Sequence, residues 1–394
     1  MAENLSSDYY RAEIAALNDE IKLLTERLSS AEESSALDKY DPFGNPTDYK
    51  GFGGDYSAVN PKIVQPGYTL PLEPGLTERT NLQRSCSIGG FSVILQFLLS
   101  QGLVMLLSSL VFWIMQKNEP GTSAVEIQNY ISSSSIMPAI TAIVFVFANL
   151  VSAHVGLRRA KIRRSLLLRP ADFRLNDGFQ YGLIGIFIWT VCSYVIQGTG
   201  YAAKALGVVI SSGSDVMSLT DGKRFAIMAV YSCLLAPVTE ELFFRGLLLR
   251  VFGKADQRFA VFASALFFGL IHGNIPQFIL CFTMGIFLGH ITLRHGSFIP
   301  AAMVHIIVNI TGTVVGVINT DFPGISYAAK MTVIVLSVLG LLLLLIFRIS
   351  DKLPIPTPHQ KKRGFGAAGG SVTYAVSLLL LMAFTGYSLV RMNM

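Results

Sequence analysis

Charged residues are scarce in this sequence. Only 14% of its 394 residues are charged and 52% are hydrophobic, whereas a soluble globular chain carries about 25% charged residues. This composition argues against an ordinary soluble enzyme and predicts a membrane protein.

Cysteines are few as well. The four of them are scattered, three lie in apolar runs, and no CxxC pair occurs, so the sequence contains no disulfide framework or thiol motif. Residues 1–30 lack the apolar core of a signal peptide, and we therefore expect none at the start of the chain. We also find no internal repeats.

Charge is distributed unevenly along the chain. Residues 1–88 carry a net charge of −6, and the remainder carries +12. A basic balance often indicates a nucleic-acid partner. Here, however, the Lys and Arg residues of the second part lie in short loops between apolar runs, as membrane topology requires. We therefore expect membrane lipid around the protein and no nucleic-acid partner.

Apolar stretches long enough to cross a bilayer recur from Ser87 onward, since about 20 helical residues suffice. They predict an all-α, polytopic bundle of about eight or nine spans. The fifth and sixth are short and separated only by Gly273, Asn274 and Ile275. The expected spans are 90–116, 136–156, 179–198, 225–249, 258–273, 276–293, 299–318, 328–348 and 371–390.

Basic loops predict the orientation of the bundle. They follow the second, fourth, sixth and eighth spans, and all four fall on one side if the spans alternate. Because basic loops stay in the cytoplasm, the N-terminus is expected there and the C-terminus outside. The protein is thus predicted to be a multi-pass membrane protein, in the cell membrane if its source is prokaryotic.

The first part of the chain divides into two predicted segments. Residues 1–37 contain apolar residues at alternating spacings of three and four, which indicates an amphipathic, coiled-coil-like helix. Self-association through residues 9–33 and a helix lying on the protein or membrane surface are both consistent with this pattern. Residues 38–88 are rich in Pro and Gly and predict a linker. The membrane domain is expected at 89–394, with its core at about 179–318. The apolar residues of the seam are Ile14, Leu17, Ile21, Leu24 and Leu28.

Two adjacent carboxylates, Glu240 and Glu241, lie inside the fourth predicted span. After residue 88 no other acidic residue falls within a span. Each ionised carboxylate near the centre of a membrane helix costs roughly 2.5–3.5 kcal/mol on insertion scales. Pro237, one turn earlier, can loosen the helix and free a carbonyl. The pair is therefore a candidate functional site.

Three polar groupings at helical spacing accompany these carboxylates. Glu241 and Arg245 are four residues apart and can pair on one helix face. Phe268 and His272 in the fifth span, and His305 and Asn309 in the seventh, have the same spacing. At a rise of about 1.5 Å per residue, all three could meet in one cavity that opens to the cytoplasm. Each grouping taken alone also fits a structural role, such as an ion pair or an interhelical hydrogen bond.

The ordered set Glu-Glu-x3-Arg, Phe-x3-His and His-x3-Asn resembles the CAAX prenyl endopeptidase family, also called the CPBP or abortive-infection intramembrane proteases. The resemblance covers about 225–318. It implies an intramembrane endopeptidase with no metal and no cofactor, in which Glu240 activates a water with His272 as partner. His305 and Asn309 would then hold the oxyanion, while Glu241 and Arg245 shape the site.

Other functions remain open from the residues alone. Glu and His side chains can ligate zinc, although the sequence has no HExxH motif, so a zinc-dependent hydrolase is one alternative. A non-enzymatic scaffold, sensor or immunity protein of the same fold is another. A proton-relay transporter is less favoured, because only one span contains acidic residues. A peptide or a membrane protein is the expected substrate, and no residue pattern identifies it further.

Overall fold

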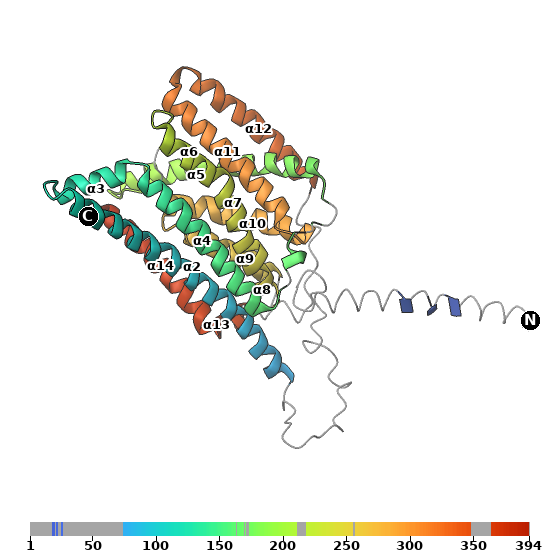
Figure 1. The fold of residues 1–394 in the computed structure, drawn as a ribbon. Helices are drawn as coiled ribbons and strands as arrows, with labels where there is room; N and C mark the ends of the chain where they lie inside the picture. Colours follow the sequence, from blue (N-terminus) through green and yellow to red (C-terminus); the bar gives the residue numbers. More distant parts are fainter. Residues whose placement is uncertain are drawn as a thin grey trace, which may run out of the picture.

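The computed structural model describes residues 18–19, 21–22, 25–26, 74–162, 164–168, 170, 173–210, 218–254, 257–347 and 364–393. Within these residues every regular element is a helix (Figure 1), which confirms the predicted all-α bundle. The elements are α2 Pro74–Asn118, α3 Ala124–Ser133, α4 Ile136–Ala160, η2 Arg164–Leu166, α5 Leu175–Ala205, α6 Gly222–Val230, η3 Tyr231–Leu235, α7 Ala236–Glu241, η4 Leu242–Leu248, α8 Leu249–Gly253, α9 Gln257–Leu270, α10 Ile275–His295, α11 Ile299–Asp321, η5 Pro323–Ile325, α12 Ser326–Phe347, α13 Gly364–Gly369 and α14 Val372–Asn393.

The described residues contain eight helical segments that are long and apolar enough to cross a membrane, so the chain is a multi-pass membrane protein. They correspond to eight of the nine expected spans. The exception is the expected span 258–273. Its helix, α9, has 14 residues, which give a length of about 21 Å, short of the ~30 Å hydrocarbon core.

The N-terminal predictions lie almost entirely outside the described residues. Residues 18–19, 21–22 and 25–26 are helical, but the rest of the predicted seam and the segment 38–73 are not described. Helix α2 begins at Pro74, so the linker predicted for 38–88 ends earlier than expected, and its last part belongs to the first span.

Two apolar clusters make up the interior of the bundle. One includes residues of α2, α4, α8, α9 and α14, and the other is formed by α5, α10 and α11. In Figure 1, α11 and α12 lie on one side and α2 and α14 on the other, with α7 to α10 between them. The fourth span contributes to the first cluster and packs against α4, α10 and α11.

The fourth span is not a regular α-helix. Its segments η3 and η4 have π-helical register and enclose the six-residue α7. The Ala236 N–H donates to the Tyr231 carbonyl, five residues back. In the same register the next carbonyl, that of Ser232, would meet Pro237, which has no N–H. The sequence prediction that Pro237 frees a carbonyl thus has a specific structural counterpart, and π segments often occur at functional sites.

A tight turn joins α9 to α10 and contains His272. Gly273 has φ of +69°, and a Cβ there would lie 2.3 Å from a ring atom of Phe384 on α14, so only glycine fits. Asn274 caps α10 by accepting from the Gln277 N–H, and its amide donates to the His272 carbonyl over 3.1 Å. His272 therefore lies in a fixed turn just beyond α9, and not on a helix face as the spacing predicted.

Candidate active site

Glu241 is the centre of a buried charge cluster. Its Oε1 accepts from Arg245 Nη1 at 2.8 Å and lies 3.0 Å from His305 Nδ1, and neither Glu241 nor Arg245 is exposed. The predicted i, i+4 pair is present, and α11 adds an imidazole to it. An unpaired buried charge is strongly destabilising, so this cluster joins α7, η4 and α11.

Arg245 is held by more than its carboxylate. Its Nη2 donates to the Gly285 carbonyl on α10 at 3.2 Å, and its guanidinium carbon lies 4.5 Å from the centre of the Phe268 ring. A Cβ on Gly285 would lie 2.9 Å from Ala265, so the absence of a side chain lets α10 approach α9 closely. The cation is thus fixed by an ion pair, a carbonyl and an aromatic face.

The Phe268 ring separates two imidazoles. Its centroid lies 5.3 Å from that of His272 and 5.7 Å from that of His305, with both rings nearly perpendicular to it. Phe268 is buried. Its position also sets the separation of the two histidines, which come from different parts of the bundle.

His272 is oriented by a backbone carbonyl. Its Nδ1 lies 2.7 Å from the Phe268 carbonyl oxygen, and because that oxygen can only accept, Nδ1 carries a hydrogen and Nε2 is the nitrogen that faces away from the α9 backbone. Nε2 lies 3.6 Å from the Cys281 sulfur. Sequence reasoning did not identify Cys281, because a single cysteine in an apolar run gives no signal.

Glu240 has surroundings unlike those of Glu241. It is partly exposed, and among the described residues it accepts no hydrogen bond. Its charge nevertheless interacts with His272, Arg245 and Tyr231. The two adjacent carboxylates therefore differ. Glu241 Oε1 binds Arg245 and His305 inside the bundle, while its Oε2 has no partner within the described residues. Glu240 is partly exposed and accepts no hydrogen bond from those residues.

Asn309 contacts the irregular part of the fourth span. Its Nδ2 donates to the Ser232 carbonyl at 2.7 Å, the carbonyl that the π register and Pro237 leave without an intrahelical partner. His305, one turn earlier on α11, holds Glu241. The predicted His-x3-Asn grouping thus attaches α11 to the fourth span at two points, Ser232 in η3 and Glu241 at the end of α7.

The six predicted residues therefore lie in the same part of the bundle, but they do not all contact one another. Direct bonds join Glu241, Arg245 and His305, whereas Glu240 and His272 are related through charge. Within the described residues, no three His, Cys, Asp or Glu side chains are placed to hold a metal ion together.

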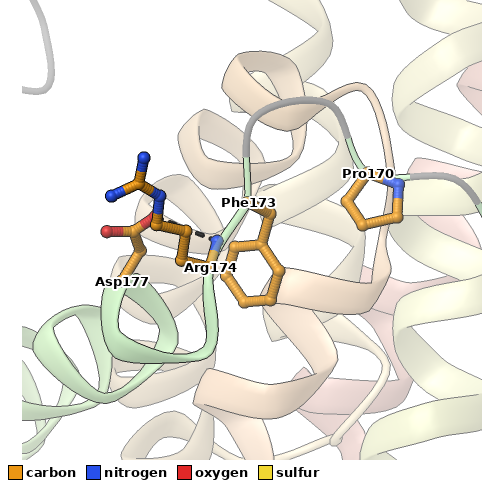
Figure 2. Close-up of a pocket in the computed structure, with 4 residues that line it drawn as sticks. All are labelled: Pro170, Phe173, Arg174 and Asp177. Atoms are coloured by element: carbon orange, nitrogen blue, oxygen red, sulfur yellow. Dashed lines mark hydrogen bonds between the residues drawn. The ribbon is translucent and has the colours of Figure 1, made fainter.

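A separate pocket of about 550 Å³ opens at the start of α5 (Figure 2). Pro170, Phe173, Arg174 and Asp177 line it, and the Asp177 carboxylate accepts from the Arg174 backbone N–H at 3.0 Å. None of the six predicted site residues lines this pocket. It therefore does not belong to the chemistry inferred from the motifs.

The helical bundle and its intramembrane carboxylates, imidazoles and amide define a multi-pass membrane protein with a buried polar cluster. Residues 222–311 match the family model for type II CAAX prenyl endopeptidase, Rce1-like. This match confirms the resemblance over that segment, which extends from α6 into α11 and contains all six predicted residues. Neither the curated proteins nor the solved structures gave a match.

Proposed function

We propose that the protein is an intramembrane endopeptidase that hydrolyses a peptide bond with a water activated by Glu240 and His272. The matched family supports this at the level of a CAAX-type protease. The observation that carries the proposal is the difference between the two adjacent glutamates. Glu241 is neutralised by Arg245 and His305, whereas Glu240 keeps its carboxylate oxygens free among the described residues.

A pair of carboxylates in divergent environments commonly divides structural and acid–base roles. In the proposed reaction the Glu240 carboxylate takes a proton from water, and the oxygen of that water bonds to the scissile carbonyl carbon. His272 presents Nε2, because Nδ1 is bound to the Phe268 carbonyl, and it accepts from the same water. The proton then passes to the leaving nitrogen as the C–N bond breaks, which yields a carboxylic acid and an amine.

The tetrahedral intermediate carries a negative charge on the former carbonyl oxygen. We assign the stabilisation of this oxyanion to His305 and Asn309. The Glu241 carboxylate, 3.0 Å from Nδ1, orients the His305 ring as a carboxylate does behind a catalytic imidazole. Nε2–H is the donor that we assign to the oxyanion. The Asn309 Nδ2 has a second hydrogen beyond the one given to Ser232. Donors fixed in a low dielectric stabilise such charge strongly.

The experiment compares Glu240→Gln with Glu241→Gln in the purified protein. The probes are a quenched fluorescent peptide ending in farnesyl-Cys-aliphatic-aliphatic-X and its non-prenylated counterpart. Glu240→Gln is expected to remove turnover and leave thermal stability unchanged, since Glu240 has no hydrogen-bond partner among the described residues to lose. Glu241→Gln is expected to lower stability, because Arg245 and His305 lose their carboxylate. Asn309→Ala should lower kcat by about 100- to 1,000-fold, the usual loss for one oxyanion donor.

Two outcomes would replace this proposal. If EDTA abolished cleavage and zinc restored it, the water would be activated by a metal and these residues would be its ligands. If Glu240→Gln kept full biological function and neither form cleaved any peptide, a scaffold or sensor role would be the better interpretation. A preference for the farnesylated over the non-prenylated peptide would define the substrate class.

A further inference from the structure

A chain of hydrogen bonds reaches α7, the short helix that contains Glu240 and Glu241, from α2 and α4. Both of these helices lie outside residues 222–311, which match the family model. Gln96 Nε2 on α2 donates to Asn149 Oδ1 on α4 at 3.0 Å, and Asn149 Nδ2 donates to Thr239 Oγ1 on α7 at 3.3 Å. Thr239 in turn donates to the Leu235 carbonyl at 2.8 Å. All three side chains are buried, and Thr239 is the residue immediately before Glu240.

These contacts hold α7 in place, because the backbone hydrogen bonds of this short helix are too few to do so. Helix α7 has six residues, lies between two π segments, and includes Pro237, which donates no backbone hydrogen bond. Its orientation therefore depends on side chains from neighbouring helices. Asn309 on α11 holds the Ser232 carbonyl, and Asn149 on α4 holds the Thr239 hydroxyl. Both α4 and α11 pack against α7 (Figure 1).

Burying the amides of Gln96 and Asn149 inside a membrane-spanning bundle costs free energy, so their presence needs an explanation. A buried amide without a partner costs on the order of 1–3 kcal/mol, and within the described residues Gln96 Oε1 and the Ser152 hydroxyl have no partner. Interhelical hydrogen bonds in membranes average only about 0.6 kcal/mol. Stability alone therefore gives little reason for an amide pair here, whereas holding a reactive carboxylate in place does.

We propose that Gln96, Asn149 and Thr239 form a positioning relay that sets the rotation of α7 and thereby the direction in which Glu240 points. Successive helical side chains differ by about 100°, so fixing Thr239 also fixes Glu240. The inference rests on the proposed function for its catalytic consequence. Its structural part, the orientation of Glu240, is testable without turnover.

The chain provides a matched control on other helices. Thr190 on α5 lies 2.7 Å from the Ser337 hydroxyl on α12 and donates to the Ile186 carbonyl at 2.8 Å. It thus makes the same two kinds of contact as Thr239, a side-chain partner on another span and the carbonyl four residues back. Valine is nearly isosteric with threonine and removes both contacts at either site.

The experiment uses the full-length protein and Thr239→Val, Thr239→Ser, Asn149→Leu and Thr190→Val. Dicyclohexylcarbodiimide, which reacts with protonated carboxyl groups in apolar surroundings, is the probe, and its adduct on Glu240 is quantified by mass spectrometry over a pH series. Thr239→Val and Asn149→Leu are expected to change the adduct yield at a given pH severalfold, because a rotated α7 points the Glu240 carboxyl into different surroundings. Thr239→Ser should restore the wild-type curve, and Thr190→Val should follow it.

Cleavage of the farnesylated peptide provides the second measurement. A small displacement of a catalytic group can cost about 100-fold, so Thr239→Val should lower kcat by roughly 10- to 100-fold and leave KM unchanged. Identical labelling in all proteins, including no labelling at all, would overturn the relay whatever the activity. Equal kinetic losses in Thr239→Val and Thr190→Val would also overturn it, since both bonds would then be merely structural. A shifted labelling curve in a protein that cleaves nothing would keep the relay and refute the protease.

Discussion

The outer spans and the central spans of this bundle use the same apolar residues in different ways. Only 6% of the most apolar stretch of α2 is buried and 11% of that in the α12 span, against 44% in α10. The outer helices are long and regular. The central segment 222–295 contains two π segments, the short α9 and the Glu241–Arg245 pair of the charge cluster. Irregular backbone is tolerated at membrane depth where protein covers it, so the outer helices provide the shield that the central site requires.

Breaking the charge cluster should have the largest effect on stability. Arg245→Met leaves Glu241 buried without its guanidinium partner, and losing one partner of a buried pair costs about 3–5 kcal/mol. The matched change on an outer helix, Arg391→Met at the exposed end of α14, should cost under about 0.5 kcal/mol. Unfolding in mixed detergent micelles measures both. Equal losses would mean that the central and outer cations do not differ in role.

Glycine substitutions sharpen the same contrast. Gly273→Ala introduces a Cβ at positive φ that meets Phe384, and a loss of about 1–3 kcal/mol is expected from the strained backbone. Gly102→Ala on α2 should be neutral or stabilising by up to about 1 kcal/mol, because open space surrounds that position and alanine favours helix. Thermal unfolding compares the two. A destabilised Gly102→Ala variant would show that α2 is covered by a partner.

Cys281 provides a test confined to the site. The thiol lies 3.6 Å from His272 Nε2, so a cysteine nucleophile is the chemical rival of an activated water. If water is the nucleophile, Cys281→Ala should lower turnover by far less than the ~100-fold typical of a lost acid–base group. Cys86→Ala, on the outer helix α2, is the control. Loss of all cleavage in Cys281→Ala alone, in a folded protein, would assign the attack to the thiol.

The smallest expected effect lies outside the spans, at the start of α3. The Ser123 backbone N–H, and then its hydroxyl, lower the pKa of Glu126 in a capping box. The ionised carboxylate therefore supports α3 fully above the ordinary pKa of glutamate, and this support is lost as pH falls through the lowered value. Amide exchange of residues 124–133 should rise over that acidic range, and Glu126→Gln should remove the pH dependence. The same pH dependence in Glu126→Gln would assign it to another group.

Periodicity predicted the helices and the faces of single helices, but not which faces meet. The Glu241–Arg245 pair was predictable because both residues lie on one turn. The contact of His305 with Glu241 joins residues 64 positions apart, and it exists only because α11 packs on α7. The relay from Gln96 to Thr239 was missed for the same reason. The length of α9 was overestimated because the apolar run continues through Ile271 up to His272, where Gly273 and Asn274 turn the chain.

Since α9 is only 14 residues long, it acts as a ruler. Each residue adds about 1.5 Å between its first turn, near Arg258, and the imidazole of His272 just beyond its other end. Four inserted residues would carry that imidazole about 6 Å further along the axis and rotate it by about 40°. In an enzyme built this way, the length of α9 would set how far the cleaved bond lies from the end of the bundle where α9 begins. The sequence of the bound peptide would then matter only among the bonds that reach this depth.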